Sequence, residues 1–284
     1  MSRLILLLLV VFPLVSHARV EVRDDAGRLV ILENPAVRIV SLAPNITEML
    51  FAAGAGAKIV GAVEHSDYPK TALALPRVGD AGALDVERIV DLRPDLVVAW
   101  KSGNPSGQIE KLESLGISVF YLEARHLPDI EEDLNRLGVL AGTQIQAQHA
   151  SARFRNMLED LTRTYAGKSK VSVFYEVWPR PLMTVSDKHI ISDVIRLCGA
   201  RNVFGSLKPL APTVSLEAVI AANPQVIVSS GPPKWLDAWR QWRIAASEKG
   251  NLFSIPPDLI SRPGPRILEG AKQLCSQIQA ARIK

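Results

Sequence analysis

The sequence predicts an α/β protein of two lobes, each a mainly parallel sheet with flanking helices, joined by one long rigid helix. Residues 84–98 recur as residues 214–228, so that Glu87 matches Glu217 and Pro94 matches Pro224 at a constant offset of 130 residues. Short apolar runs alternate with helical patterns on both sides of a long helical stretch. This period is too long for a solenoid, so it indicates two similar lobes with a cleft between them, where small ligands usually bind.

The first predicted lobe covers residues 19–126. Apolar runs bounded by glycine, proline or polar turns are typical of buried strands, and capped apolar segments are typical of helices. We expect a hairpin at 20–31, strands at 38–42, 59–63, 96–100 and 118–122, and helices at 48–53, 86–92 and 108–115. Alternation of this kind favours a parallel sheet covered on both faces.

Residues 127–167 lack a strand signal and carry apolar residues at helical spacing, which predicts a connecting helix with a break near Gly142. A continuous helix is a stiff spacer, so we expect little hinge motion between the lobes.

The second predicted lobe covers residues 168–284. We expect strands at 171–175 and 226–229, a short strand at 259–260, and helices at 190–197, 216–222, 235–246 and 266–281. Trp235, Trp239 and Trp242 fall on one face of the third of these helices. We interpret them as helix-on-sheet packing or as partly exposed surface, with a ligand contact as the alternative.

The N-terminus has the pattern of a secretory signal peptide. Arg3 precedes an apolar run at residues 4–15, and Ser16 and Ala18 place small residues before an expected cleavage after Ala18. The run is shorter than the about 20 residues of a membrane span. We therefore expect residues 1–18 to be removed and the mature protein to be soluble in the periplasm.

The charge distribution bears on the kind of partner that the protein binds, and the cysteine count bears on its disulfide bonds. The 33 Lys and Arg and 29 Asp and Glu are interleaved, with a net charge of +4, which argues against a nucleic-acid surface. Cys198 and Cys275 are the two cysteines, and in an oxidising compartment an even number favours a disulfide, here closing a loop of 77 residues. Two buried free thiols are the alternative.

Aromatic and polar residues gather just after predicted strands, where open α/β sheets bind ligands. These residues are Tyr68, Trp100, Trp178, Asp258 and Arg262. Aromatic faces with few charges suit a large, flat, partly apolar ligand. Core packing is the alternative for each tryptophan taken alone.

Glu87 and Glu217 occupy the first turns of the repeated helices. Their carboxylates either complement the helix dipole or form a matched acidic pair, one on each lobe, that meets basic sockets on a partner.

Catalytic patterns are weak. The histidines are dispersed, and Ser186, Asp187 and His189 are too close in sequence to be presumed a triad. No dinucleotide or phosphate-loop motif is present. We expect a protein that is not an enzyme and has neither a metal site nor a cofactor of its own.

Seven segments carry a family resemblance and keep their order along the chain. They are RIVSLAPNITEMLFAAG, SDYP, LDVERIVDLRPDLVVAW, YEVWPRPLMT, IRLCGARNVFG, VSLEAVIAANPQVIV and DLISRPGPRI. With them the chain resembles the substrate-binding proteins of ABC importers for cobalamin and iron complexes, and most of all the cobalamin-binding members. The resemblance implies the helical-backbone (class III) fold, a corrinoid such as cobalamin as transported ligand, and delivery to a permease dimer with ATPase subunits by a protein that is monomeric when free.

The resemblance also implies roles for single residues. Tyr68 and Trp100 would line the ligand site from the first lobe, and Asp258 and Arg262 would face the ligand from the second. Trp178 and Met183 lie in the segment that supplies the second wall. Glu87 and Glu217 match the acidic pair that docks on permease arginines, and Cys198 and Cys275 match the disulfide positions.

The chain departs from the cobalamin pattern at Ala81 and Ala211, where tryptophans are expected. A wider pocket leaves haem or a siderophore as alternative ligands, and Trp178 is a candidate to compensate. A secreted α/β hydrolase and an adhesive module are the alternatives from other classes.

Overall fold

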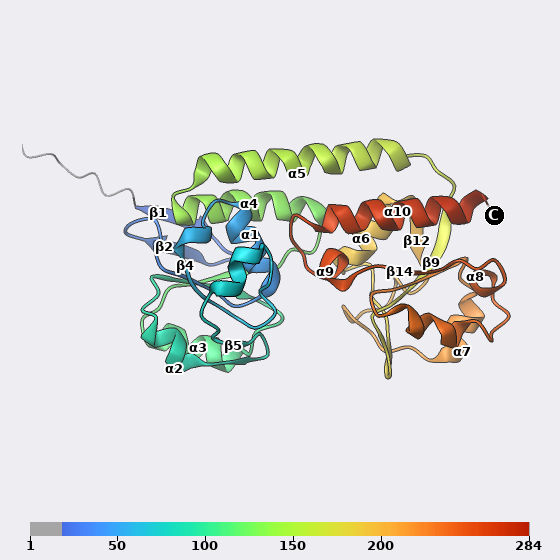
Figure 1. The fold of residues 1–284 in the computed structure, drawn as a ribbon, viewed down its shortest axis with the longest axis horizontal. Coiled ribbons are helices and arrows are strands. Elements are labelled where there is room, and N and C mark those ends of the chain that lie inside the picture. The colour runs from blue at the N-terminus through green and yellow to red at the C-terminus, as the bar shows by residue number, and fades with distance from the viewer. Residues whose placement is uncertain (1–18, 284) are drawn as a thin grey trace, which may run out of the picture.

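The computed structural model describes residues 19–283 and shows two α/β lobes side by side beneath a layer of long helices (Figure 1). The predicted signal peptide, residues 1–18, lies outside the described residues. Within residues 19–283, no helix combines the length and apolar character needed to cross a membrane.

The first lobe is built on a four-stranded parallel sheet in the order β4-β3-β7-β8. Its strands are β3 (Ile39–Ser41), β4 (Ile59–Ala62), β7 (Leu96–Trp100) and β8 (Val119–Leu122). In β7, Leu96 and Val98 join one core cluster, whereas Val97 and Ala99 join another. Because successive side chains point to opposite faces, the unbroken apolar run of this strand follows from burial on both sides.

Helices cover both faces of this sheet. Helix α1 contributes Ile46 and Leu50 to one core cluster, and Ile89 of α2 and Ile109 of α3 belong to the other. The remaining elements of the lobe are β1 (Val20–Arg23), β2 (Leu29–Leu32), α1 (Pro44–Ala52), η1 (Gly56–Lys58), η2 (Lys70–Ala74), β5 (Gly79–Asp80), β6 (Ala83–Leu84), α2 (Val86–Asp91) and α3 (Ser106–Ser114).

The second lobe repeats this topology. Its parallel sheet has the order β12-β9-β13-β14, so β9 corresponds to β3, β13 to β7 and β14 to β8. Its strands are β9 (Val171–Glu176), β12 (Ala200–Asn202), β13 (Val226–Ser229) and β14 (Leu252–Ser254). The predicted class of two parallel-sheet lobes is confirmed.

Two expectations for the second lobe are wrong. Residues 259–260 belong to a short helix rather than a strand, because Pro257 at its first position favours helix initiation. Residues 235–246 do not form one helix, since a 3-10 helix ends at Trp239 and a separate short helix follows. The remaining elements are β10 (Trp178–Pro179), β11 (Leu182–Met183), α6 (Ile190–Leu197), α7 (Leu216–Ala222), η3 (Pro233–Trp239), α8 (Ala245–Glu248), α9 (Pro257–Ile260) and α10 (Ile267–Ile283).

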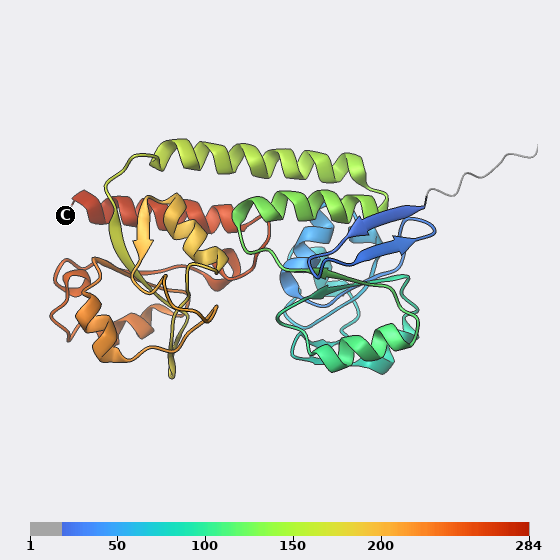
Figure 2. The same ribbon diagram turned by 180° about the vertical axis from the view of Figure 1, so that it is seen from behind.

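The connecting segment is a helical hairpin rather than one continuous helix. Helix α4 (Leu127–Ala141) ends at Gly142, whose φ of 65° terminates it, and α5 (Gln144–Tyr165) runs back along α4 and over both lobes (Figures 1 and 2). The face of α5 that carries Ala147, Ala150 and Phe154 is buried. The long helix between the lobes is therefore α5.

The predicted disulfide is confirmed. Cys198 at the end of α6 and Cys275 in α10 are bonded, with their Cα atoms 4.6 Å apart. Both lie in the largest core cluster, which includes residues of both lobes and of the helices above them.

Candidate ligand site at the junction between the lobes

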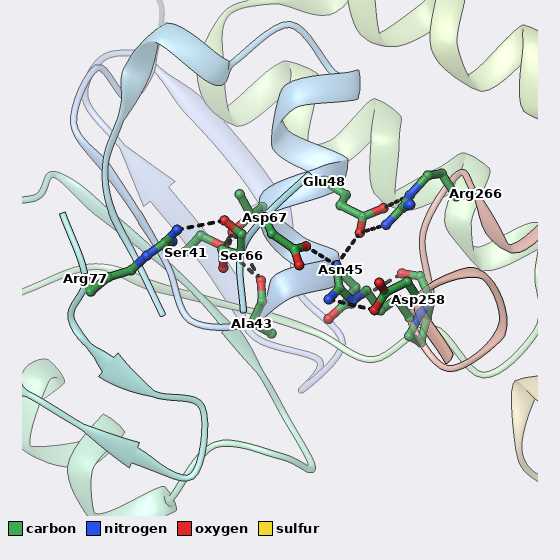
Figure 3. Close-up of polar contacts among 12 residues, drawn as sticks. Ser41, Ala43, Asn45, Glu48, Ser66, Asp67, Arg77, Asp258 and Arg266 are labelled. Carbon is green, nitrogen blue, oxygen red and sulfur yellow. Dashed lines mark hydrogen bonds and ion pairs between the residues drawn. The ribbon is translucent and has the colours of Figure 1, made fainter. Parts of the chain in front are cut away.

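A cluster of charged side chains joins the two lobes (Figure 3). Glu48 of α1, with only 2% of its side chain exposed, accepts hydrogen bonds from Arg266 Nε at 2.8 Å and Arg266 Nη2 at 2.6 Å. Arg262 Nη1 lies 3.0 Å from the same carboxylate. One buried acid of the first lobe thus holds two guanidiniums of the second, a charge-assisted contact with little exposure to water.

Arg262 is shared among three carboxylates. Besides Glu48 it contacts Asp67 Oδ1 at 2.7 Å and Asp258 Oδ1 at 2.8 Å, while its own side chain is 14% exposed. The hydrogen bond from Arg262 lowers the pKa of Asp67. Asp67 and Asp258 are about half exposed, so these two partners, unlike Glu48, are open to exchange with a ligand.

Tyr68 packs against the same cluster. The Arg266 guanidinium lies 3.9 Å from the centre of the Tyr68 ring, a cation–π contact. The loop that carries Asp67 and Tyr68 is fixed at its base, because Arg77 donates to the Ser66 carbonyl at 3.1 Å and the Thr47 hydroxyl bonds that of Ser66 at 3.1 Å.

Trp100 reaches the junction from the carboxyl end of β7. It lines a cavity of about 40 Å³ together with Asn45 of its own lobe and Pro263 of the other. Asn45 Nδ2 donates to the Pro263 carbonyl at 3.2 Å, so two of the lining residues are joined across the lobes. Tyr68 instead lines a separate hollow of about 410 Å³ beside Phe51, Phe154 and Arg266.

The structure therefore brings Tyr68, Trp100, Asp258 and Arg262 to one junction, although Tyr68 and Trp100 do not share a single enclosed cavity. Trp100 is 37% exposed and Tyr68 44% exposed. Neither aromatic side chain is buried in a core, so each has exposed surface that a ligand can contact.

Trp178 and Met183 lie apart from this cluster, on the β10–β11 hairpin of the second lobe, where they pair across the two strands. Trp178 is 50% exposed and donates from Nε1 to the Arg180 carbonyl at 3.0 Å. Its ring contacts Trp235 of the same lobe. The role of Trp178 and Met183 as a second wall remains a prediction.

Glu87 and Glu217 are both exposed and lie in the first turns of α2 and α7. Figure 1 shows these helices at the ends of the two lobes farthest from α5. Asp85 caps α2 and Ser215 caps α7, so neither glutamate is needed as a cap. Hydrogen bonds from its own backbone N–H and from Ser215 lower the pKa of Glu217.

The Ser186, Asp187 and His189 groups have structural partners. His189 Nδ1 accepts from the Ile191 N–H at 3.1 Å and so caps α6, and Asp187 pairs with Arg196 at 3.2 Å. Burial lowers the pKa of His189 to about 4. Over residues 19–283, no group of three or more His, Cys, Asp or Glu side chains is placed to hold a metal ion.

The sequence did not single out Glu48, Asp67 and Arg266 as members of the site. Glu48 and Arg266 are separated by 218 residues, so no local pattern links them. The position of Asp67 just after the β4 strand, next to Tyr68, is the one signal that could have pointed to it.

Comparison with known proteins agrees with this fold. The model of the family described as periplasmic binding protein matches residues 39–259, and the chain belongs to that family. It is 37% identical over 253 residues to a vitamin B12-binding protein of Vibrio campbellii, covering 88% of this chain and 92% of that one.

Two solved structures extend the comparison. The periplasmic vitamin B12 binding protein BtuF of Vibrio cholerae is 34% identical, with a TM-score of 0.83, and the match covers 88% of this chain and 99% of that one. A periplasmic heme binding protein from Pseudomonas aeruginosa is 25% identical, with a TM-score of 0.75 over 85% of this chain and 92% of that one. The predicted resemblance to binding proteins of this class is confirmed.

Proposed function

We propose that this protein is a periplasmic substrate-binding protein that captures cobalamin (vitamin B12) or a related corrinoid between its lobes and delivers it to an inner-membrane ABC importer. The observation that carries the proposal is the meeting of Tyr68, Trp100 and Arg262, from both lobes, at one junction in a chain 37% identical to a vitamin B12-binding protein. A corrin ring is broad, partly apolar and edged with amides. Aromatic faces suit the ring, and Asp258 and Arg262 suit the amides.

Titration with cyanocobalamin tests this proposal. We expect a saturable change in the corrinoid absorption spectrum at micromolar protein, and a corrinoid adduct in native mass spectrometry of the mature chain. Haem and ferric siderophores form the comparison panel. Absence of a cyanocobalamin complex at micromolar concentration contradicts the proposal.

Delivery of the ligand requires a surface that binds the permease. We assign this role to Glu87 and Glu217, because they are exposed, occupy equivalent positions in the repeated lobes, and lie on helices at the same end of the molecule (Figure 1). Such exposed pairs set register and encounter rate more than affinity. The partner is then a permease dimer with its ATPase subunits, met by a monomeric binding protein without enzymatic activity.

The proposed location follows from the N-terminal pattern. A signal peptide cleaved after Ala18 releases the mature chain into the periplasm, which is also the compartment where the Cys198–Cys275 disulfide can persist.

A haem carrier of the same fold is the second candidate. It is favoured by the Pseudomonas aeruginosa heme binding protein and by Ala81 and Ala211, which leave the walls of the site less filled than tryptophan does. An anionic siderophore is disfavoured. The guanidiniums of Arg262 and Arg266 already face three carboxylates, so the cluster offers no surplus positive charge.

A further inference from the structure

Trp100 in the first lobe and Trp235 in the second each pack against a glycine. A Cβ atom added to Gly103 meets Cε3 of Trp100 at 1.8 Å, and one added to Gly231 meets Cε3 of Trp235 at 1.9 Å. Each indole therefore lies directly on a glycine in the loop that follows a strand. Only glycine permits so close an approach of a ring to the backbone.

The two strands concerned are equivalent. Strand β7, which ends at Trp100, and β13, which ends at Ser229, occupy the same third position in the four-stranded sheets and belong to the repeated segments. Each lobe thus places an indole over a glycine just after the carboxyl end of an equivalent strand, β7 in the first lobe and β13 in the second. This end of an open parallel sheet is where ligands bind.

Trp235 is distinct from the other two tryptophans near it. Trp239 is 3% exposed and lies within the core cluster of the second lobe, against which Trp242 packs. Trp235 remains partly exposed and meets the ring of Trp178 edge-on, with ring centres 5.1 Å apart and planes at 79°. The core of the lobe therefore accounts for Trp239 and Trp242 but not for the pair Trp178–Trp235.

A buried acid holds this arrangement in place. Glu176 Oε2 accepts a hydrogen bond from Trp239 Nε1 at 2.7 Å, and Glu176 is 2% exposed. This contact ties η3, which carries Trp235, to the end of β9, which leads into Trp178. The two rings are positioned by packed structure rather than by free loops.

We propose that Trp235 and Trp178 together form the aromatic wall of the second lobe and that Trp235, the counterpart of Trp100, contacts the planar face of the ligand. The inference rests on the proposed function, since it assumes a flat macrocyclic ligand between the lobes. It replaces the tryptophans missing at Ala81 and Ala211 with an indole pair at a different place. The mixed edge and face surface of such a pair determines which macrocycles fit.

Affinity for cyanocobalamin and haem tests the wall, measured by absorption titration of the mature chain and its variants. We expect Trp235→Ala to weaken binding of the preferred macrocycle by about tenfold or more, as for tryptophan anchors in other interfaces. Trp235→Phe, which keeps a flat ring, should stay within about threefold of the unchanged protein. Trp242→Ala is the matched control of the same residue type and should leave affinity unchanged.

A second pair of variants tests the contact between Gly231 and Trp235 without removing the indole ring. Gly231→Ala forces the Trp235 ring to move and should weaken binding in the same direction. Gly107→Ala, at a helical position where an added Cβ meets nothing within 4 Å, should bind normally. Thermal unfolding of each variant identifies any that fail to fold.

The outcomes separate the two proposals. Wild-type binding of cyanocobalamin together with undiminished binding by Trp235→Ala overturns the wall and leaves the proposed function intact. If the wild type binds haem but not cyanocobalamin, a corrinoid is not the ligand, and the same variants then test the aromatic wall with haem. Binding of neither macrocycle by the wild type overturns both.

Discussion

At the scale of single residues, the buried carboxylate of Glu48 holds two guanidiniums that come from the opposite lobe. In Glu48→Gln, Arg266 loses the carboxylate that it pairs with and Arg262 loses one of its three; each guanidinium is less than one-fifth exposed. We expect the free energy of unfolding to fall by about 3 kcal/mol, the lower end for breaking a buried pair, because Arg262 keeps Asp67 and Asp258. Denaturant unfolding measures this change.

Glu131→Gln is the matched control for Glu48→Gln. Glu131 pairs with Arg155 at 2.8 Å, but Arg155 is half exposed. The control should cost less than about 1 kcal/mol. Equal losses in the two variants contradict a special role for Glu48.

His189 makes stability depend on pH. Burial lowers its pKa to about 4 in the folded state, against about 6.5 when unfolded, so the unfolded chain binds the extra proton between these values. The contribution of His189 to stability is therefore full above pH 6.5 and is lost as the pH drops toward 4, by at most about 3 kcal/mol. Buried Asp133, whose pKa is raised to about 7, contributes in the opposite direction, so the His189 contribution is read from the difference between variants.

His189→Asn tests this dependence, because asparagine can keep the cap on α6 without titrating. We expect thermal unfolding of this variant to vary less between pH 7 and pH 4.5 than that of the unchanged protein. The exposed His149→Asn should leave the dependence as it is. An unaltered pH profile in His189→Asn contradicts the assignment.

At the scale of elements, α2 and α7 present their acidic first turns at the same end of the molecule (Figure 1). Glu87→Ala combined with Glu217→Ala should leave ligand affinity unchanged and impair uptake, since neither residue contributes to the junction between the lobes. Transport in reconstituted vesicles or in cells measures the second effect. Normal uptake by the double variant refutes the docking role, and Asp91→Ala, elsewhere on α2, serves as the control.

The disulfide joins α6 to α10 and closes a loop of 77 residues. In the chain-entropy account, such a loop stabilises the folded state by about 4 kcal/mol. Cys198→Ala with Cys275→Ala should lower the unfolding free energy by about this amount, and reduction of the unchanged protein should have a similar effect. Both cysteines are buried, so a reductant that leaves the melting temperature unchanged calls for a check of the thiols before the bond is judged dispensable.

The predicted elements succeeded where burial leaves a strong sequence pattern. Strands β7 and β13 are buried on both faces and were found from their apolar runs. Strands β12 and β14 were missed because they are short edge strands, and β12 carries the polar residues Arg201 and Asn202. A two-residue apolar pair such as Leu259 and Ile260 cannot distinguish strand from helix.

The candidate site was predictable in part for a similar reason. Tyr68, Trp100 and Arg262 are marked by residue type and by position after a strand or before the closing helix, and the structure brings them to one junction. Glu48 and Arg266 were not predictable, because their pairing depends on how the lobes dock and no local rule encodes that. Trp235 is distinguished from Trp239 and Trp242 only by the structure, in which its contact with Gly231 resembles that of Trp100 with Gly103.

At the scale of the whole molecule, two lobes share one core. The largest core cluster includes Phe120 of the first lobe, Phe154 of α5, Tyr175 of the second lobe and Leu274 of α10. Smaller clusters, represented by Ile89 and by Val219, lie within single lobes. Since the shared cluster and the Glu48 contacts both cross the junction, opening one lobe exposes surface of the other.

We therefore expect a single calorimetric transition in which the calorimetric and van't Hoff enthalpies agree, although the chain has two lobes. Ile89→Ala removes packing from the smaller core cluster of the first lobe, and Val219→Ala does so in that of the second lobe. We expect the free energy of unfolding to fall by about 2–4 kcal/mol in Ile89→Ala and by less in Val219→Ala, because valine is smaller. Either variant should shift the whole transition downward rather than split it. Two resolved transitions, with one variant moving only one of them, would show that the lobes unfold independently and that the connecting helices transmit little between them.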